Sequence, residues 1–344
     1  MKILKLLPVF VFAFASCESD ESREAPLGSY DNGILVLSEG DMLSGSVTYV
    51  SDNLQTVQQN IFSLVNPSQS MGGFVQSMFF HGDRAFLISN FANKITVVNR
   101  YTFEYIATIT TGLDHPRYGT VMGGKAYVTN QATWDSTADD FVRVIDLTNL
   151  SVGESLIVGD YAERIVSENG KLYVSNGAFG LGEGFTIIDA ASGNTTKINT
   201  GISPNSLEIE DNHLFVLCST IGGTGKIVKF NLNTEAITEI PLPDTILTAS
   251  NLDIEDDYMY FTAGGKVYKV PENATSVTDN PLFDTQNTSF YMGYGFAVED
   301  GRVYITEAAA DFVSDGSLYI YSTSGSFIKQ IPTGVGPNGI YFND

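Results

Sequence analysis

The sequence is poor in positive charge. Its 344 residues include 18 lysines and arginines against 40 aspartates and glutamates, which gives a formal net charge of −22. Nucleic acids and anionic lipid surfaces are bound through basic patches, and this chain has few residues from which to build one. The charge balance therefore argues against both partner classes and predicts a solvated, self-repelling surface.

Cysteine and histidine are also scarce. Of the two cysteines, Cys17 lies near the N-terminus and Cys218 lies inside an apolar run, so the folded domain has no internal disulfide. Cys218 is expected to be a small buried hydrophobe rather than a nucleophile. The three histidines, His81, His115 and His213, fall at different positions of the repeat described below, which argues against a three-histidine metal site.

Signatures of catalysis are missing as well. The sequence suggests no Ser-His-Asp arrangement and has no glycine-rich phosphate loop after a strand. The acidic run "DSTADD" (135–140) lacks the glycine-punctuated pattern of an EF-hand, so we expect its acids to be solvated rather than to bind calcium. We therefore expect a protein without catalytic residues, cofactor or metal.

The chain shows no long amphipathic helix, and strand and turn residues dominate it. One phrase recurs: "GGKAYVTN" (123–130), "NGKLYVSN" (169–176), "DNHLFVLC" (211–218), "DDYMYFTA" (256–263) and "DGRVYITE" (300–307). An apolar or aromatic anchor near the middle of each unit occurs seven times, at Leu35, Phe86, Tyr127, Tyr173, Phe215, Tyr260 and Tyr304. Their spacing of about 45 residues is typical of four-stranded propeller blades.

The two ends of the chain complement each other. An inner strand precedes six of the anchors, but residues 18–32 before the first anchor are polar. The chain instead ends with "GPNGIYFND" (336–344), which matches "SPNSLEIED" (203–211) before a later anchor. We therefore predict an all-β fold, a single seven-bladed β-propeller over residues 33–344. Its blades are four-stranded and antiparallel, and the C-terminal strand closes blade 1.

The N-terminus has a different character. "MKILKLLPVFVFAFASC" (1–17) is a secretion signal, too short to be a stable membrane span. Its end resembles a lipobox, in which Cys17 would be lipidated and become the first mature residue. Phe14 replaces the usual leucine there, so cleavage by the ordinary signal peptidase is the alternative. With residues 18–32 as a flexible acidic tether, this pattern predicts a domain anchored to a membrane through lipid only.

The two faces of the predicted propeller differ in their loops. One face has short turns such as "ENG" and "EDD", whereas the other has long loops such as 130–140 and 307–316. Long loops on a rigid scaffold commonly carry binding sites, and aromatic rings beside polar groups suit a flat or partly apolar ligand. The candidate aromatic contacts are Tyr118, Trp134, Tyr161, Phe179, Tyr291, Tyr294 and Phe312. The alternative is that about half of the loop aromatics pack between blades.

Polar residues stand just before each inner strand. Aligning the blades there gives a ring at one mouth of the channel: Gln76, Arg117, Glu163, Asn205, Ser250, Tyr294 and Asn338. The next position adds Tyr118, Arg164 and Asn251, so two of the few arginines lie at this mouth. We include Gln76, Arg117, Glu163, Arg164, Asn205, Asn251 and Asn338 with the aromatic residues as candidate ligand contacts. The alternative is the water-filled polar channel that propellers commonly have.

The repeat also carries a family resemblance. "KAYVTN" (125–130) contains the YVTN signature, and "GVGPNGIYF" (334–342) is similar to the lead-in to the inner strand in the same family. Residues 33–344 thus resemble the secreted YncE-like, YVTN-repeat seven-bladed propellers. Resemblance to the cobalamin-binding BtuG-type surface lipoproteins implies a nutrient-binding protein beside a TonB-dependent outer-membrane transporter. The acidic run after Cys17 resembles one that directs some bacterial lipoproteins to the cell surface; the periplasmic face is the alternative.

These observations favour a non-enzymatic lipoprotein that binds a small molecule, cobalamin-like or another nutrient, on its loop-rich face. One alternative is a protein-interaction scaffold of the cell envelope that grips a peptide with the same face. A second alternative is a lactonase or other hydrolase, for which Glu163 with Arg117 is the only pair able to serve.

Overall fold

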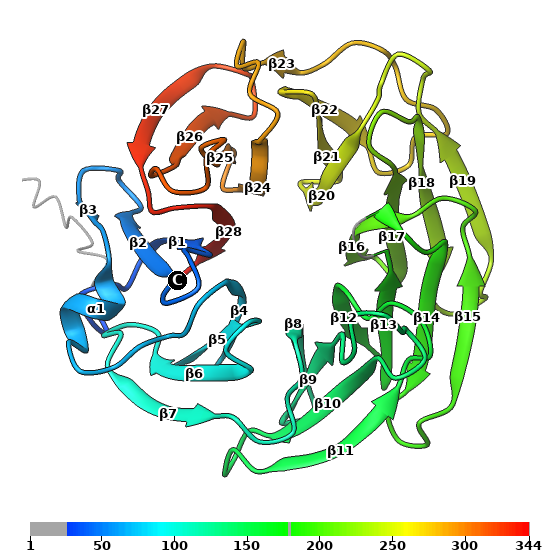
Figure 1. Ribbon diagram of the computed structural model, residues 1–344. Coiled ribbons are helices and arrows are strands. Elements are labelled where there is room, and N and C mark those ends of the chain that lie inside the picture. Colours follow the sequence, from blue (N-terminus) through cyan, green and yellow to red (C-terminus); the bar gives the residue numbers. More distant parts are fainter. Residues whose placement is uncertain (1–25, 178–179, 344) are drawn as a thin grey trace, which may run out of the picture.

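The structure is a computed structural model that describes residues 26–177 and 180–343. Seven four-stranded sheets stand as blades around a common centre (Figure 1). Neighbouring strands within each sheet run antiparallel, and one short helix, α1 (Ile61–Val65), packs beside β2 (Ser46–Ser51). The predicted all-β propeller with seven blades is thus confirmed.

The blades are numbered along the chain, and each is given from its inner to its outer strand. Blade 1 contains β28 (Pro337–Phe342), β1 (Gly33–Ser38), β2 and β3 (Val57–Gln58). Blade 2 contains β4 (Val75–His81), β5 (Arg84–Ser89), β6 (Lys94–Asn99) and β7 (Tyr105–Ile109). Blade 3 contains β8 (Pro116–Met122), β9 (Lys125–Asn130), β10 (Phe141–Asp146) and β11 (Val152–Ile157).

The remaining four blades repeat this order. Blade 4 contains β12 (Ile165–Glu168), β13 (Lys171–Asn176), β14 (Gly184–Asp189) and β15 (Thr195–Asn199). Blade 5 contains β16 (Pro204–Glu210), β17 (His213–Ser219), β18 (Gly225–Asn231) and β19 (Ile237–Pro241). Blade 6 contains β20 (Ala249–Glu255), β21 (Tyr258–Ala263), β22 (Lys266–Pro271) and β23 (Phe283–Asp284). Blade 7 contains β24 (Met292–Glu299), β25 (Arg302–Glu307), β26 (Ser317–Ser322) and β27 (Phe327–Pro332).

Apolar side chains fill every interface between adjacent blades. Alternate residues of a strand point to opposite faces of its sheet, so a strand buried on both faces is apolar throughout. In β1, Ile34 and Val36 pack against blade 7, whereas Leu35 and Leu37 pack against blade 2. Seven buried clusters result, one for each interface. This double burial explains the continuous apolar runs around the anchors.

Tight turns connect the first two strands of most blades on one face. Both central residues have positive φ, the geometry that fits the right-handed twist of a hairpin and favours Gly, Asn and Asp. These pairs are Gly123–Gly124, Asn169–Gly170, Asp211–Asn212, Asp256–Asp257 and Asp300–Gly301. The acidic residues of these turns thus have a structural reason for their positions.

The C-terminal strand closes the ring as predicted. β28 is the inner strand of blade 1 and pairs antiparallel with β1, which brings the two ends of the described chain side by side (Figure 1). Asn343 follows β28 and is fully buried. Its Nδ2 donates to the carbonyl oxygens of Tyr30 at 2.5 Å and Arg100 at 2.9 Å, and its Oδ1 accepts from Arg100 Nε at 2.5 Å. The chain end is therefore fastened to blade 2 as well as to blade 1.

Part of the expected tether lies against the propeller. Of residues 18–32, the structure describes 26–32, and there Tyr30 is buried. The Tyr30 ring contacts those of Tyr49 and Phe103 edge-on, with centroids 5.4 and 5.8 Å apart. The packed body therefore begins before β1. The predicted signal and lipidation residue, 1–17 with Cys17, lie outside the described residues.

We predict that the Asn343 fastening is needed for full stability. Asn343→Ala leaves two carbonyl groups and one Arg100 donor without their partner, so the free energy of unfolding should fall by about 1–3 kcal/mol. Removing residues 337–344 exposes the edge of β1 and should abolish cooperative thermal unfolding. Circular dichroism against temperature measures both. The control Asn149→Ala alters an exposed turn and should have little effect; equal melting of the truncated and full chains would contradict the closure.

Candidate functional site

Exposed apolar side chains are concentrated on the face of the propeller that has the long loops. They come from six of the seven blades and from the segments that link blades. We call this set the apolar crown: Met42, Leu43, Phe74, Phe91, Trp134, Leu181, Ile221, Leu247, Phe290 and Val313. Several are more than half exposed, with Leu43 at 79% and Trp134 at 78%. A concentration of apolar tips on one face marks it as the face where contact with another molecule is favourable.

Bulges interrupt the inner strands at the predicted polar ring. The register of pairing shifts within β4, β8, β16, β20 and β24, in each case near the strand's start. A bulge re-aims the side chains of its unpaired residues, and such features often border functional sites. The shifted segments contain Gln76, Arg117, Tyr118, Asn205, Asn251 and Tyr294.

Four ring and loop residues form one charged network at the mouth. Arg117 donates from Nε and Nη2 to the two carboxylate oxygens of Glu163, at 2.9 and 2.6 Å, and from Nη1 to Gln76 Oε1 at 2.5 Å. Gln131 Nε2 donates to Glu163 Oε2 at 2.8 Å. Burial alone would lower the pKa of Arg117, but the paired carboxylate outweighs it and the pKa is raised. The structure thus unites Gln76, Arg117 and Glu163 as predicted and adds Gln131.

The aromatic candidates of blade 7 pack on one another. Tyr291 meets Phe312 edge-on at 4.9 Å between ring centroids, and Tyr294 meets Phe312 at 5.5 Å. Tyr294 also donates its hydroxyl to Glu39 Oε1 at 2.7 Å. Burial raises the pKa of Glu39, while this hydrogen bond and the charge of Arg117 act in the opposite direction. These three aromatics therefore form a partly buried wall that reaches the polar mouth.

Three candidate asparagines tie adjacent blades together. Each side-chain Nδ2 donates to a backbone carbonyl on the next inner strand. The bonds are Asn205 to Ala249 at 2.8 Å, Asn251 to Gly293 at 2.6 Å and Asn338 to Gln76 at 3.0 Å. The side-chain donors of these asparagines thus bind the backbone of the neighbouring blade. This structural role could not be predicted from the alignment of the blades. Asn338 Oδ1 has no hydrogen-bond partner within residues 26–177 and 180–343.

A cavity of about 450 Å³ lies among the loops of blades 3 and 4. Its lining combines the aromatic and apolar side chains of Trp134, Tyr161 and Leu181 with six polar residues: Gln131, Thr133, Asp135, Ser136, Thr137 and Asp140. Small-molecule sites are typically mostly apolar clefts with a few polar groups and volumes of about 300–1,000 Å³. Gln131 joins this loop cavity directly to the charged network of the mouth. The predicted contacts Trp134 and Tyr161 thus meet in one place.

The predicted solvent exposure of Asp140 is wrong. We expected the acids of 135–140 to be solvated, but Asp140 is only 1% exposed. Its Oδ2 accepts the backbone N–H of Ala162 at 2.9 Å, whereas its Oδ1 has no partner among the described residues. Burial raises its pKa to about 7. Its position directly before the apolar strand β10 was the available signal for burial.

Of the remaining candidates, two line the central channel and two are not described by the structure. Tyr118 and Arg164 line a second cavity inside the central channel, with Asn251 and Asn338. Phe179 and Cys17 lie outside the described residues. Among residues 26–177 and 180–343, no group of three or more histidine, cysteine or acidic side chains could hold a metal ion. No helix in that part of the chain is long and apolar enough to cross a membrane.

A family model described as a domain of unknown function, DUF5074, matches residues 32–342. No curated protein matches the chain. Among solved structures, the periplasmic gluconolactonase PpgL of Pseudomonas aeruginosa has a TM-score of 0.65 at 12% identity. That match covers 91% of this chain and 99% of that one.

Two further solved structures have the same architecture. Apo AztD from Citrobacter koseri has a TM-score of 0.58 at 11% identity and covers 90% of this chain and 96% of its own. BamB from Moraxella catarrhalis has a TM-score of 0.53 at 13% identity and covers 90% and 85%. At these identities the likeness concerns the fold alone, because propellers host unrelated functions.

The buried Asp140 predicts an unusual pH dependence of stability. A carboxyl group with a raised pKa in the folded state favours folding when protonated, so its contribution is full below its ordinary pKa and is lost as the pH rises through about 7. Asp140→Asn should flatten the fall in melting temperature between about pH 4 and pH 7. Asp135→Asn removes the same charge at an exposed position and serves as the control. Equal profiles for the two variants would contradict this role.

Proposed function

Since the chain belongs to the DUF5074 family, which is described only as a domain of unknown function, we propose its role from its own site. It is a non-enzymatic cell-envelope lipoprotein that binds a small molecule on the loop-rich face of its propeller. The observation that carries this proposal is the loop cavity, where an exposed tryptophan and a tyrosine lie beside a buried carboxyl oxygen that has no partner in the described part of the chain.

The chemistry of the cavity defines the ligand class. Trp134, Tyr161 and Leu181 offer surface for a flat or partly apolar body. Asp140 Oδ1 needs a donor, because a buried acceptor without a partner costs about 1–3 kcal/mol. A nutrient with an extended apolar body and amide or amine donors fits both demands. Cobalamin-like molecules are of this kind, which accords with the resemblance of the repeat to BtuG-type propellers.

Attachment and partner follow from the same proposal. Lipidation of Cys17 would hold the domain at the outer membrane, at the cell surface or on the periplasmic side, with residues 18–25 as the link. A TonB-dependent transporter is the proposed recipient of the ligand. The apolar crown supports contact with such a partner, since apolar tips on one face are costly in water and favourable in an interface.

The same crown favours the second candidate, a protein-interaction scaffold that grips a peptide. The lactonase alternative has weaker support, although the fold is shared with a gluconolactonase. A general base needs a free oxygen within reach of the substrate proton. Both carboxylate oxygens of Glu163 accept hydrogen bonds from Arg117, and one also accepts from Gln131. The pair is thus better suited to fix the shape of the mouth than to move protons.

Trp134 gives the test of small-molecule binding. It is the only tryptophan, so the indole fluorescence of the protein reports on the loop cavity alone. We expect cyanocobalamin, or another nutrient with an apolar body and amide groups, to quench it saturably at micromolar concentration. Calorimetry corrects for light absorption by the ligand. Trp134→Ala and Asp140→Asn should each weaken binding at least about tenfold, as expected for loss of one stacking or charged contact.

Ile221→Ala is the matched control for Trp134, because Ile221 is a similarly exposed tip of the crown, on blade 5. It should leave binding of the small molecule unchanged. Saturable binding that ignores Trp134 and Asp140 would contradict the assigned cavity. Binding of peptides alone, with loss in Ile221→Ala and Trp134→Ala alike, would favour the scaffold.

Lipidation gives a separate prediction. The mature protein isolated from membranes should begin at Cys17 and carry the mass of a diacylglyceryl group. Cys17→Ser should release the protein into the soluble fraction without changing its melting temperature, because the propeller folds independently of the anchor. Mass spectrometry of the N-terminal peptide measures this. An unmodified N-terminus at another residue would contradict the lipoprotein assignment.

A further inference from the structure

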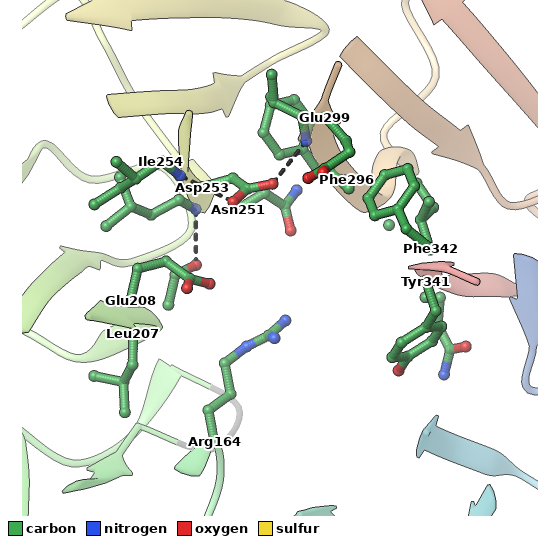
Figure 2. Close-up of a pocket in the computed structure, with 18 of the residues that line it drawn as sticks. Arg164, Leu207, Glu208, Asn251, Asp253, Ile254, Phe296, Glu299, Tyr341 and Phe342 are labelled. Carbon is green, nitrogen blue, oxygen red and sulfur yellow. Dashed lines mark hydrogen bonds between the residues drawn. The ribbon is translucent and has the colours of Figure 1, made fainter. Parts of the chain in front are cut away.

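A second cavity lies inside the central channel and is distinct from the loop cavity. It has a volume of about 360 Å³ and is lined by the inner strands of blades 5, 6, 7 and 1 with residues of blades 3 and 4 (Figure 2). This volume is within the range of small-molecule pockets. The lining shares no residue with that of the loop cavity.

An arginine enters this cavity with its hydrogen-bonding capacity unused. Figure 2 shows the Arg164 side chain, from the residue directly before β12, reaching toward the middle of the cavity. The guanidinium lies 4.8 Å from the ring centroid of Tyr118 but donates no hydrogen bond to any residue the structure describes. Its backbone is fixed, because Arg164 N donates to Ser175 Oγ at 2.9 Å. A guanidinium has five N–H donors in a planar fork that matches a carboxylate.

Three acids line the same cavity, Glu208, Asp253 and Glu299, and the first two occupy equivalent positions on adjacent blades. Glu208 pairs with the anchor Phe215, and Asp253 pairs with the anchor Tyr260, so both occupy the same position of the repeat. The other five blades carry uncharged residues there: Tyr341, Phe79, Thr120, Val166 and Ala297. With Glu299, the acids of the cavity come from the three consecutive blades 5, 6 and 7.

Glu208 and Asp253 differ in how they are held. Asp253 accepts the backbone N–H of Ile254 on Oδ1 at 2.9 Å and that of Val298 on Oδ2 at 2.7 Å, which fixes its orientation. The Glu208 carboxyl group forms no hydrogen bond or ion pair with the described chain, and it points into the cavity in Figure 2. Burial raises the pKa of both acids; for Glu208 the charge of Asp253 adds to this rise, and the charge of Arg164 acts in the opposite direction.

We propose that this cavity binds a small zwitterion, with its carboxylate on Arg164 and its ammonium group between Glu208 and Asp253. A simple anion would bring its charge close to two carboxyl groups, and a simple cation would lie near the guanidinium. A molecule with both charges satisfies both walls at once, and charge-assisted hydrogen bonds of this kind are the strong ones. Free α-amino acids and short peptides have this chemistry.

The test uses the intact propeller and a set of free amino acids, ω-amino acids and dipeptides. Thermal shift selects the best ligand, and calorimetry then compares it with its N-acetylated and C-amidated forms. We expect each modification to weaken binding at least about tenfold, the loss of one charge-assisted contact. Glu208→Gln should weaken the zwitterion tenfold yet leave the N-acetylated form unchanged. Arg164→Gln should do the same for the C-amidated form.

Matched controls separate these effects from general loss of charge. Glu210→Gln removes one acid from an exposed position on the same strand, and Arg84→Gln removes one arginine elsewhere. Both should bind like the original protein. Arg164→Lys keeps the charge but loses the fork and should bind weakly, which provides a milder variant if Arg164→Gln unfolds.

Three results would overturn the proposal: no member of the set binds at millimolar concentration, the N-acetylated or C-amidated form binds as tightly as the zwitterion, or both central variants bind like the controls. The comparison of ligand forms uses the unaltered chain, so it stands even if every variant is unstable. The outcome is independent of the loop cavity. Zwitterion binding should persist in Trp134→Ala, and failure of either site leaves the other untouched.

Discussion

Burial of both faces of every blade is the constraint on which the rest of the structure depends. An interior blade can bury its two faces only between two neighbours, so an open row of blades always leaves two apolar faces in water. Each buried side chain of the anchor type stabilises the fold by about 1.5–3 kcal/mol, and an open row would lose this at both ends. Closing the ring removes both ends. The pairing of β28 with β1 is therefore what allows seven similar, individually unstable units to form one domain.

Closure also decides where polar groups can lie. The inner strands converge on the channel, and there the side chains of Asn205, Asn251 and Asn338 bond to the backbone of the next blade. Two of the accepting carbonyl groups, those of Gly293 and Gln76, belong to residues in bulged segments, where strand pairing is interrupted. The scaffold is thus rigid at the channel, and the long loops above it are free to differ from blade to blade. The loop cavity between blades 3 and 4 can form because those loops take no part in closing the ring.

The sequence predicts the architecture well because each blade repeats the same physical demands. The period of the anchors, the two-residue turns and the match between residues 203–211 and 336–344 all recur, so each blade supports the interpretation of the others. The site does not repeat, and here prediction was weaker. The alignment placed Asn205 and Tyr294 at one mouth but could not show that a bulge turns the first toward a carbonyl and the second toward Glu39. Asp140 was expected to be one solvated acid among several, whereas the structure buries it and bonds its Oδ2 to the backbone N–H of Ala162.

The two arginines near the mouth show how one scaffold holds opposite kinds of polar site. Bringing an ion out of water costs several kcal/mol unless partners compensate it. The charge of Arg117 is compensated within the protein by the two oxygens of Glu163 and by Gln76. Most of its N–H donors are therefore used inside the protein and few can bind a ligand. Arg164 has the ring of Tyr118, a contact worth about 0.5–2 kcal/mol, which is less than the cost. A bound carboxylate would supply the remaining compensation, because its two oxygens match the planar fork of the guanidinium. Two arginines from adjacent blades thus have different roles: Arg117 stabilises the mouth of the channel, and Arg164 can bind a ligand.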